Sequence, residues 1–188
     1  MNPWTKAPAK AAAQRDNIAT AVPEITTERL VLRLPRIADW AVLEPIWTTD
    51  RAVHFGGPFT AEAAWLDFNQ LVAGWVLRGH GALTICTHDG AVQGMVLLGH
   101  EYGDPDAELG WLLTESAEGH GYATEAARAM LPLCRALYGD DFVSYIAMAN
   151  TASIRIAEKL GAVKDAPHPR RAADIVTYRY TTQGDSDD

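Results

Sequence analysis

The chain has 188 residues, 48% hydrophobic and 21% charged, a composition typical of a globular protein with one full core. Its net charge of −8 argues against broad binding to the phosphate backbone of a nucleic acid. No apolar run approaches the ~20 residues of a membrane span and no signal-peptide core is present, so we expect a cytoplasmic protein. Cys86 and Cys134 are expected to be buried thiols in a reducing compartment rather than a disulfide.

The two ends of the chain differ in composition from the middle. Residues 1–24 are rich in Ala, Lys and Pro and have no apolar face before Ile18, so we favour a flexible extension over an amphipathic helix. Residues 182–188 form an acidic tail. We therefore expect one domain over residues 25–181, with neither a linker nor an internal repeat inside it.

The first part of the domain reads as one strand followed by two helices. Residues 28–34 alternate polar and apolar side chains, which predicts a strand with one face in water. Asp39 is positioned to cap a helix, HFGGPF at 54–59 interrupts the chain, and Thr60 begins a second helix. The aromatic side chains of both helices are expected to pack in the core, with the wall of a substrate pocket as the alternative.

Three consecutive antiparallel strands are expected next. Residues 82–87 and 91–100 flank a turn at His88–Gly90 and predict a hairpin, and the short apolar run at 107–113 predicts a buried third strand. The remaining elements alternate helix and strand, and they are a helix from Tyr122, a strand at 142–148, a helix from Asn150 to Lys159 ended by Gly161, and strands at Val163 and 175–180. Pro132 should kink the first of these helices or cost ~3 kcal/mol unless packing compensates.

The link between the third strand and the next helix contains Gly119 and Gly121. Glycines let a backbone approach a ligand closely, and the unpaired N–H groups of a first helical turn point toward an anion. This strand, glycine loop and helix therefore predict a phosphate site, although a plain tight turn explains the same glycines.

Other kinds of site are disfavoured by their missing patterns. Ser116, Ser144 and Ser153 lack the G-x-S-x-G setting of a hydrolase nucleophile, and the glycines fit neither a Walker loop nor a dinucleotide fingerprint. The histidines do not pair at metal-ligand spacing, so we expect no metal site; they are His54, His80, His88, His100, His120 and His168.

Four segments in order and register resemble the GNAT N-acyltransferases, in particular the branch of Rim-type ribosomal-protein N-terminal acetyltransferases. They are ITTERLVLRL, AELGWLL, EGHGYATEA and ANTASIRIAEKLGA, and the resemblance covers residues 25–180. It implies an α/β (α+β) fold with a mixed, mostly antiparallel sheet of six to seven strands, about four flanking helices and splayed central strands.

The resemblance also implies a binding site for acetyl-CoA. EGHGYA matches the pyrophosphate loop of the family, with Glu118 where the family usually carries Gln or Arg. Asn150 matches a residue that hydrogen-bonds the pantetheine arm. The complete implied set of cofactor-binding residues is Trp111, Leu112, Leu113, Glu118, Gly119, His120, Gly121, Tyr122, Ala123, Thr124, Asn150 and Ser153.

Attack of an amine on a thioester needs a neutral amine and a proton for the departing thiolate. The resemblance gives the role of base to Glu108, with a solvent-exposed turn carboxylate as the alternative. Many members of the family have a tyrosine that acts as the general acid at the position of Ala157. Some members have a glutamate base at the position of Tyr145. Ser153 is therefore the candidate acid, unless it only bonds its own helix backbone.

We therefore expect acetyl transfer from acetyl-CoA to a primary amine, which is either a protein N-terminal α-amine or a small molecule. The acceptor should bind between the first two helices, near Trp47, Phe55 and Trp65, and the loop 165–173, where Arg170 and Arg171 lie. A non-catalytic acyl-CoA sensor and a toxin acting on charged tRNA are the alternatives. We expect no membrane or nucleic-acid partner, and either a monomer or a homodimer.

Overall fold

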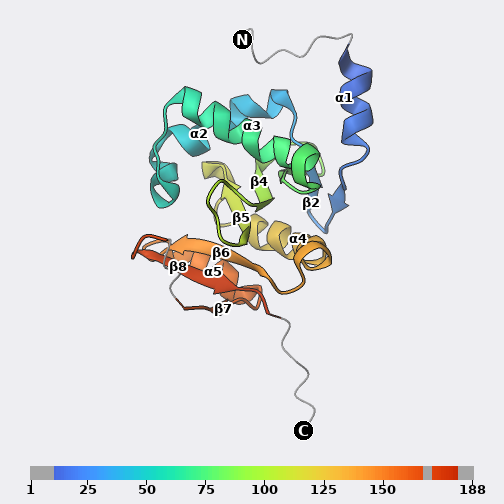
Figure 1. Cartoon of the computed structure of the whole chain (residues 1–188). Helices are drawn as coiled ribbons and strands as arrows, with labels where there is room; N and C mark the ends of the chain where they lie inside the picture. The colour runs from blue at the N-terminus through green and yellow to red at the C-terminus, as the bar shows by residue number, and fades with distance from the viewer. Residues whose placement is uncertain (1–10, 167–170, 182–188) are drawn as a thin grey trace.

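A single mixed sheet organises the molecule, with helices on both of its faces (Figure 1). The computed structural model describes residues 11–166 and 171–181. In these residues the strand order is β1-β2-β3-β4-β5-β6-β8-β7, and every neighbouring pair is antiparallel except β5–β6. The strands are β1 (Ile25–Thr26), β2 (Leu30–Arg33), β3 (Ala82–Thr87), β4 (Val92–Gly99), β5 (Ala107–Leu113), β6 (Phe142–Ala147), β7 (Val163–Lys164) and β8 (Ile175–Arg179).

Five α-helices and three short 3-10 helices complete the described part of the chain. They are α1 (Ala12–Ala19), η3 (Ile37–Asp39), α2 (Trp40–Thr48), η4 (Asp50–Phe55), α3 (Ala61–Arg78), η5 (Glu115–Ala117), α4 (Tyr122–Tyr138) and α5 (Thr151–Lys159). The α/β architecture expected from the sequence is confirmed. The sheet has eight strands rather than six or seven because the two-residue strand β1, which the sequence did not predict, extends one edge.

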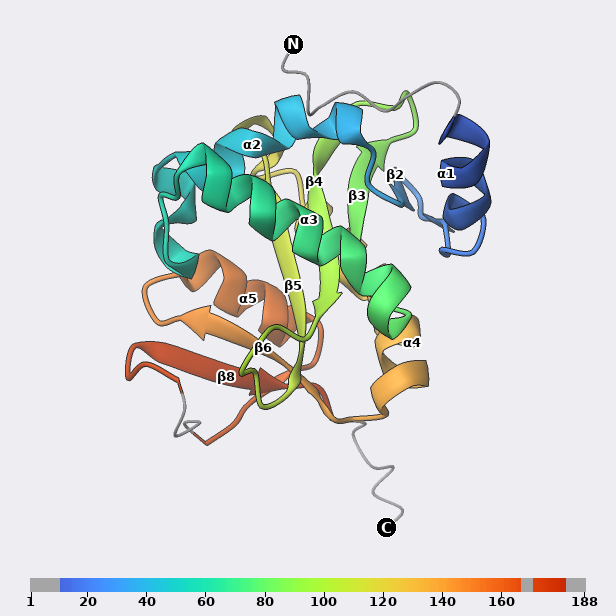
Figure 2. The same ribbon diagram turned by 45° about the horizontal axis from the view of Figure 1, so that its top comes forward.

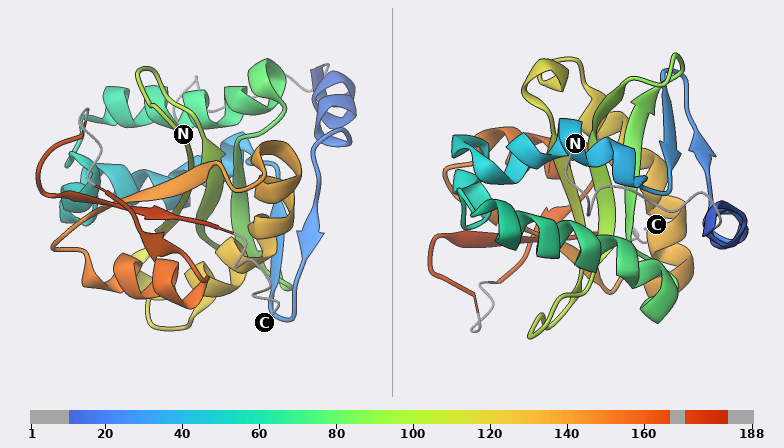
Figure 3. Two further views of the ribbon diagram at one scale, coloured as in Figure 1. Left: turned by 60° about the horizontal axis from the view of Figure 1, so that its bottom comes forward. Right: turned by 90° about the horizontal axis from the view of Figure 1, so that it is seen from above.

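The helices bury two separate apolar clusters against the two sides of the sheet. One lies under α4 and α5 and contains Leu109, Met130 and Phe142, all fully buried. The other lies under α2 and α3 and contains Trp40 and Trp47. Figure 3 shows α2 and α3 on one side of the strands and α4 on the other. The prediction that the aromatics of α2 and α3 are mainly core residues is confirmed.

The two central strands separate soon after they meet. β5 and β6 are paired in parallel only at Ala107↔Phe142 and Glu108↔Val143. From that point the two strands run apart, as Figure 2 shows. The Ser144 hydroxyl donates to the carbonyl of Leu109 at the base of this split. In the described residues, the edge of β5 that would face β6 has no strand partner beyond Leu109, and we call the interval between the two diverging strands the slot.

Two local expectations need correction, and a third can be compared with the structure. Asp39 precedes α2, but its carboxylate makes no cap to that helix; it accepts from Arg33, the backbone N–H of Arg36 and the Thr84 hydroxyl. Residues 12–19 are helical rather than loose. Helix α4 continues through Pro132, and Met130, Leu131 and Cys134 around it are buried, which fits the alternative that packing offsets the missing donor.

The described residues also bear on three simpler expectations. Cys86 and Cys134 are both buried and free, as expected. In residues 11–166 and 171–181, no helix combines the length and apolarity that crossing a bilayer requires. Over the same ranges, His, Cys and acidic side chains do not gather in threes as metal ligands would.

Candidate functional site

The slot between β5 and β6 leads directly into the glycine loop. β5 ends at Leu113, η5 turns the chain, and the loop from Glu118 to Gly121 enters α4. Gly119 and Gly121 have φ of +76° and +79°, the left-handed region that favours glycine. Among the described residues, the backbone amides of 119–124 find no acceptor. A set of free N–H groups at a helix start is suited to binding a phosphate.

His120 stabilises the loop from within. Its Nδ1 lies 2.8 Å from the carbonyl oxygen of Glu118, and its ring stacks on that of Tyr122, with centroids 5.5 Å apart. These contacts give the loop a defined shape before any ligand arrives. His120 therefore contributes to the loop through its ring as well as its backbone.

Arg29, in the turn before β2, clamps the other side of the loop. Its Nε donates to Glu125 Oε2 at 2.7 Å, and its Nη1 donates to the carbonyl of His120 at 2.9 Å. The Glu125 carboxylate also accepts from the Thr27 hydroxyl and the Arg29 amide. The first turn of α4 is thus fastened to the edge of the sheet.

A second arginine reaches the loop from η4. Arg51 Nη2 donates to the carbonyl of Leu113 at 2.8 Å and to Glu118 Oε1 at 2.6 Å. The carboxylate of Glu118, unexpected in a phosphate loop, is therefore paired with a cation. Neither Arg29 nor Arg51 was expected from the sequence, and no local signal identifies them, because each meets the loop across more than 60 residues.

Ser153 lies at the slot on the side of α4 and α5. Its Oγ accepts a hydrogen bond from Trp111 Nε1 at 3.2 Å, which joins β5 to the first turn of α5. Asn150 caps that helix, and its Oδ1 accepts from the Ser153 amide at 3.1 Å. Because the hydroxyl oxygen accepts from the indole, its own proton remains available to a ligand. The structure thus brings Trp111, Asn150 and Ser153 together.

Glu108 occupies the opposite face of β5. Side chains alternate along a strand, so Glu108 shares the side of Leu112, which packs against the α2–α3 cluster. Burial raises its pKa to about 8, Arg171 opposes the rise, and Asp104 and Glu101 add to it. The carboxyl group is partly buried, so the alternative of a fully exposed turn residue is wrong.

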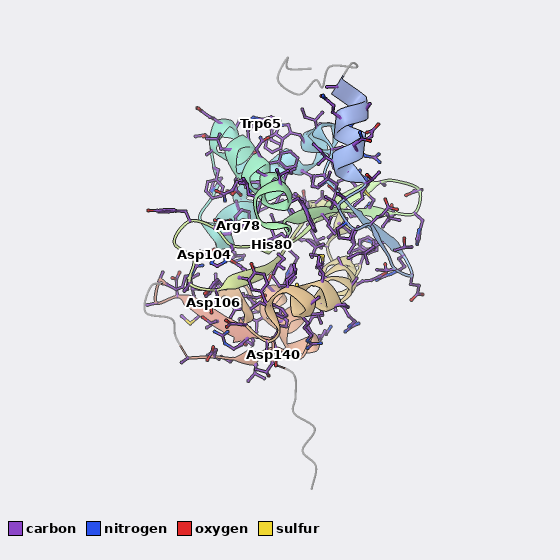
Figure 4. All side chains as sticks on the ribbon, turned by 45° about the vertical axis from the view of Figure 1, so that its right-hand side comes forward. Trp65, Arg78, His80, Asp104, Asp106 and Asp140 are labelled. Carbon is purple, nitrogen blue, oxygen red and sulfur yellow. The ribbon has the colours of Figure 1, made fainter. Side chains whose placement is uncertain are left out.

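Two loops meet beside Glu108. Arg171 donates to Asp104 at 2.5 Å and lies over the Tyr145 ring, 3.8 Å from its centroid. The Tyr145 hydroxyl donates to Asp106 at 2.6 Å. Figure 4 labels Asp104 and Asp106 on the loop before β5, where it approaches the C-terminal strands. Arg171, expected from the sequence in the loop beside the acceptor site, is paired with the Asp104 carboxylate and lies close enough to act on the pKa of Glu108.

The other residues expected to lie near the amine acceptor differ in burial. Trp47 is fully buried and donates to Asp67 at 2.6 Å, and the Trp65 ring packs against Trp40. Phe55 is exposed at the end of η4. Trp47 is thus a core residue because its ring fills the space between α2 and α3. Arg170, like His168, lies outside the described residues.

The chain is similar to a known protein family and to solved structures. The model of the GNAT acetyltransferase domain matches residues 29–163. An acetyltransferase structure from Agrobacterium tumefaciens is 36% identical, with a TM-score of 0.81, and the match covers 86% of this chain and 95% of that one. A comparison with curated proteins found no match.

Two more distant structures share the fold. A RimL ribosomal-protein α-N-acetyltransferase in complex with coenzyme A is 19% identical, with a TM-score of 0.66 and coverage of 84% and 97% of the two chains. A microcin C7 self-immunity acetyltransferase in complex with acetyl-CoA and AMP is 15% identical, with a TM-score of 0.63 and coverage of 83% and 94%.

Proposed function

The chain belongs to the GNAT acetyltransferase family, and from this premise we propose that it transfers an acetyl group from acetyl-CoA to a primary amine. The observation that carries the proposal is the separation of β5 from β6 after Glu108, which leads into the free amides of 119–124. A thioester arm and its phosphates need such a slot and loop in continuity. The acceptor is a protein N-terminal α-amine or a small-molecule amine.

In this proposal, acetyl-CoA lies along the open edge of β5. The loop amides bind its pyrophosphate, with the Thr124 hydroxyl as a further donor. The backbone of Trp111, Leu112 and Leu113 pairs with the pantetheine arm, since this edge has no strand partner. Asn150 caps α5 through its Oδ1 and so positions Ser153, and its Nδ2 donates to the pantetheine arm.

Glu108 acts as the base in this reaction. The amine nitrogen attacks the carbonyl carbon of the thioester, the C–S bond breaks, and the amine proton passes to the ionised Glu108 directly or through water. A base with a pKa of about 8 matches an α-amine, whose pKa is ~7.7–8.0, better than a lysine amine near ~10.4. The negative charges of Glu101 and Asp104 near Glu108 also attract a protonated amine toward the site.

The departing thiolate leaves on the other face of β5, where Ser153 passes its hydroxyl proton to the sulfur and takes a replacement proton from solvent water. Thiols have a pKa near ~8.5, so the thiolate needs little assistance. The indole N–H of Trp111, bound to the Ser153 oxygen, strengthens the hydroxyl as a donor. Base and acid thus act from opposite sides of the slot.

The experiment that tests this proposal measures free thiol from acetyl-CoA with and without a panel of amines and short peptides. Thiol release that depends on the amine supports transfer and ranks the acceptors. Binding of acetyl-CoA by calorimetry with no thiol from any acceptor favours the non-catalytic sensor instead. Absence of binding contradicts the assignment of the glycine loop.

Replacing Ser153 by Ala should lower kcat about tenfold and leave KM for acetyl-CoA nearly unchanged, because one assisting donor of the transition state is lost. Steady-state kinetics with a saturating amine measure the change. Ser116→Ala is the matched control, since Ser116 is exposed on η5 and its hydroxyl meets only Thr114 among the described residues. Equal effects of the two substitutions would remove Ser153 from the mechanism.

A further inference from the structure

The contact between Arg51 and Glu118 joins η4 to the first residue of the phosphate loop. Arg51 Nη2 is shared between Glu118 Oε1 at 2.6 Å and the Leu113 carbonyl at 2.8 Å. The Nε of Arg51 is buried and has no hydrogen-bond partner among the described residues. The guanidinium therefore lies at the junction of the slot and the loop, with its Nη2 directed toward the loop.

The two partners of this ion pair differ in their surroundings. The Arg51 side chain is 20% exposed, whereas that of Glu118 is 61% exposed. Arg51 is the one partner of the Glu118 carboxylate in the described part of the chain. The arginine is thus fixed by its surroundings, and the carboxylate can turn into water without leaving a buried charge behind.

The arginine on the other side of the loop is arranged differently. Glu125 accepts from Thr27 and from both the backbone and the side chain of Arg29. The Glu125 carboxylate is 18% exposed, so releasing Arg29 from it would break several hydrogen bonds at once. Arg29 therefore fastens the loop, and Arg51 is the cation that a ligand can recruit.

We infer that Arg51 binds the pyrophosphate of acetyl-CoA and that Glu118 occupies its guanidinium only until the phosphate replaces it. This inference rests on the proposed function and adds a residue from outside the loop to the acyl-CoA site. η4 therefore supplies a cation at the start of the phosphate loop.

Physical chemistry favours this exchange. A guanidinium presents a planar fork of donors that matches two phosphate oxygens, and such bidentate charge-assisted pairs are stronger than a pair with an exposed carboxylate. The chain carries a net charge of −8, so a polyanionic ligand gains from a local cation.

The test measures the Kd of CoA by titration calorimetry for wild type, Arg51→Gln and Glu118→Gln. Arg51→Gln should weaken binding about tenfold. Glu118→Gln should tighten it about threefold, because the amide can still accept from Arg51 but no longer competes with the phosphate. Two partners of a purely structural ion pair would instead change the Kd in the same direction. Arg15→Gln, in an exposed pair on α1, is the control for loss of one positive charge.

A second measurement separates phosphate binding from a general defect. S-acetylpantetheine lacks the pyrophosphate, so its kcat/KM should be the same in wild type and Arg51→Gln, whereas kcat/KM for acetyl-CoA should fall about tenfold. Equal losses for both donors, or no loss for either, overturn the role of Arg51. A wild-type chain that binds no CoA overturns the proposed function itself, and with it this inference.

Discussion

Replacing Glu108 by Gln should lower kcat/KM about 100-fold, the lower end of what a positioned acid or base contributes. Glutamine keeps the size of the side chain and its partial burial but cannot take a proton from the attacking amine. The measurement is amine-dependent thiol release from acetyl-CoA under conditions that give kcat and KM separately. Acetyl-CoA affinity should be unchanged, because the glycine loop is untouched.

Glu62→Gln is the matched control, since Glu62 is exposed in the first turn of α3. It makes the same side-chain replacement away from the slot and should retain full activity. A loss of less than threefold in Glu108→Gln would assign proton removal to water alone.

The same carboxyl group should give the reaction a defined pH dependence. Burial raises the pKa of Glu108 to about 8, so only about a tenth of it is ionised at pH 7. The ratio of wild-type to Glu108→Gln kcat/KM should therefore rise about tenfold between pH 7 and pH 9. Taking the ratio with one acceptor cancels the titration of the amine. A flat ratio would contradict the assignment of the base.

Folding stability should show the opposite trend for this group. The unfolded chain releases the Glu108 proton near the ordinary value of 4.5, while the folded chain holds it to about 8. The free energy of unfolding should therefore decrease as pH rises through this window. Denaturant unfolding of wild type and Glu108→Gln would show the slope in the first and its reduction in the second.

Asp39→Ala should destabilise the fold by about 3–5 kcal/mol, the cost of removing one partner from a buried ion pair. Arg33 and Asp39 are 13% and 5% exposed, with Nη1 2.8 Å from Oδ2. The substitution leaves Arg33 as an unpaired charge and deprives Thr84 and the Arg36 amide of their acceptor. Denaturant unfolding at neutral pH measures the loss, which is a large share of a typical domain stability of ~5–15 kcal/mol.

Two further variants support the interpretation of that loss. Asp16→Ala removes a carboxylate from an exposed pair on α1 and should leave the unfolding midpoint unchanged. Adding Arg33→Met to Asp39→Ala should recover part of the stability, because no unpaired charge then remains in the core.

Burial opposes ionisation of Asp39, but its bonds with Arg33 and the Arg36 amide hold its pKa below the usual 3.8. Its stabilisation should therefore be present above that pH and lost as pH falls further.

Periodicity in the sequence predicts most of the fold. The expected strands at 82–87, 91–100 and 107–113 correspond to β3, β4 and β5, because their side chains alternate or are continuously apolar. The expected helix from Tyr122 and the glycine loop before it were also found where expected. These features depend on residues close together in the sequence, so the amino-acid sequence of one chain is enough to predict them.

The contacts that shape the site join residues far apart in the chain. Arg51 meets Glu118, and Arg29 meets Glu125, across separations of 67 and 96 residues. Trp111 meets Ser153 across 42 residues. No periodicity encodes such pairs, since they arise only when the sheet brings its edges and loops together.

Asp39 illustrates a local signal overruled by tertiary structure. An aspartate before an apolar helical pattern predicts a cap. In the fold, Arg33 on β2 and Thr84 on β3 offer its carboxylate stronger partners. Helix α2 begins at the expected place, but the Asp39 side chain bonds residues of strands β2 and β3 instead of capping the helix.

The most direct test of acetyl transfer combines thiol release with the mass of the acceptor. The purified 188-residue chain is incubated with acetyl-CoA and an amine that supports turnover, and free thiol and acetylated amine are quantified together. One acetylated amine for each thiol released is the expected result. Thiol released at the same rate without any amine, or an amine that never gains an acetyl group across the panel, would contradict the account.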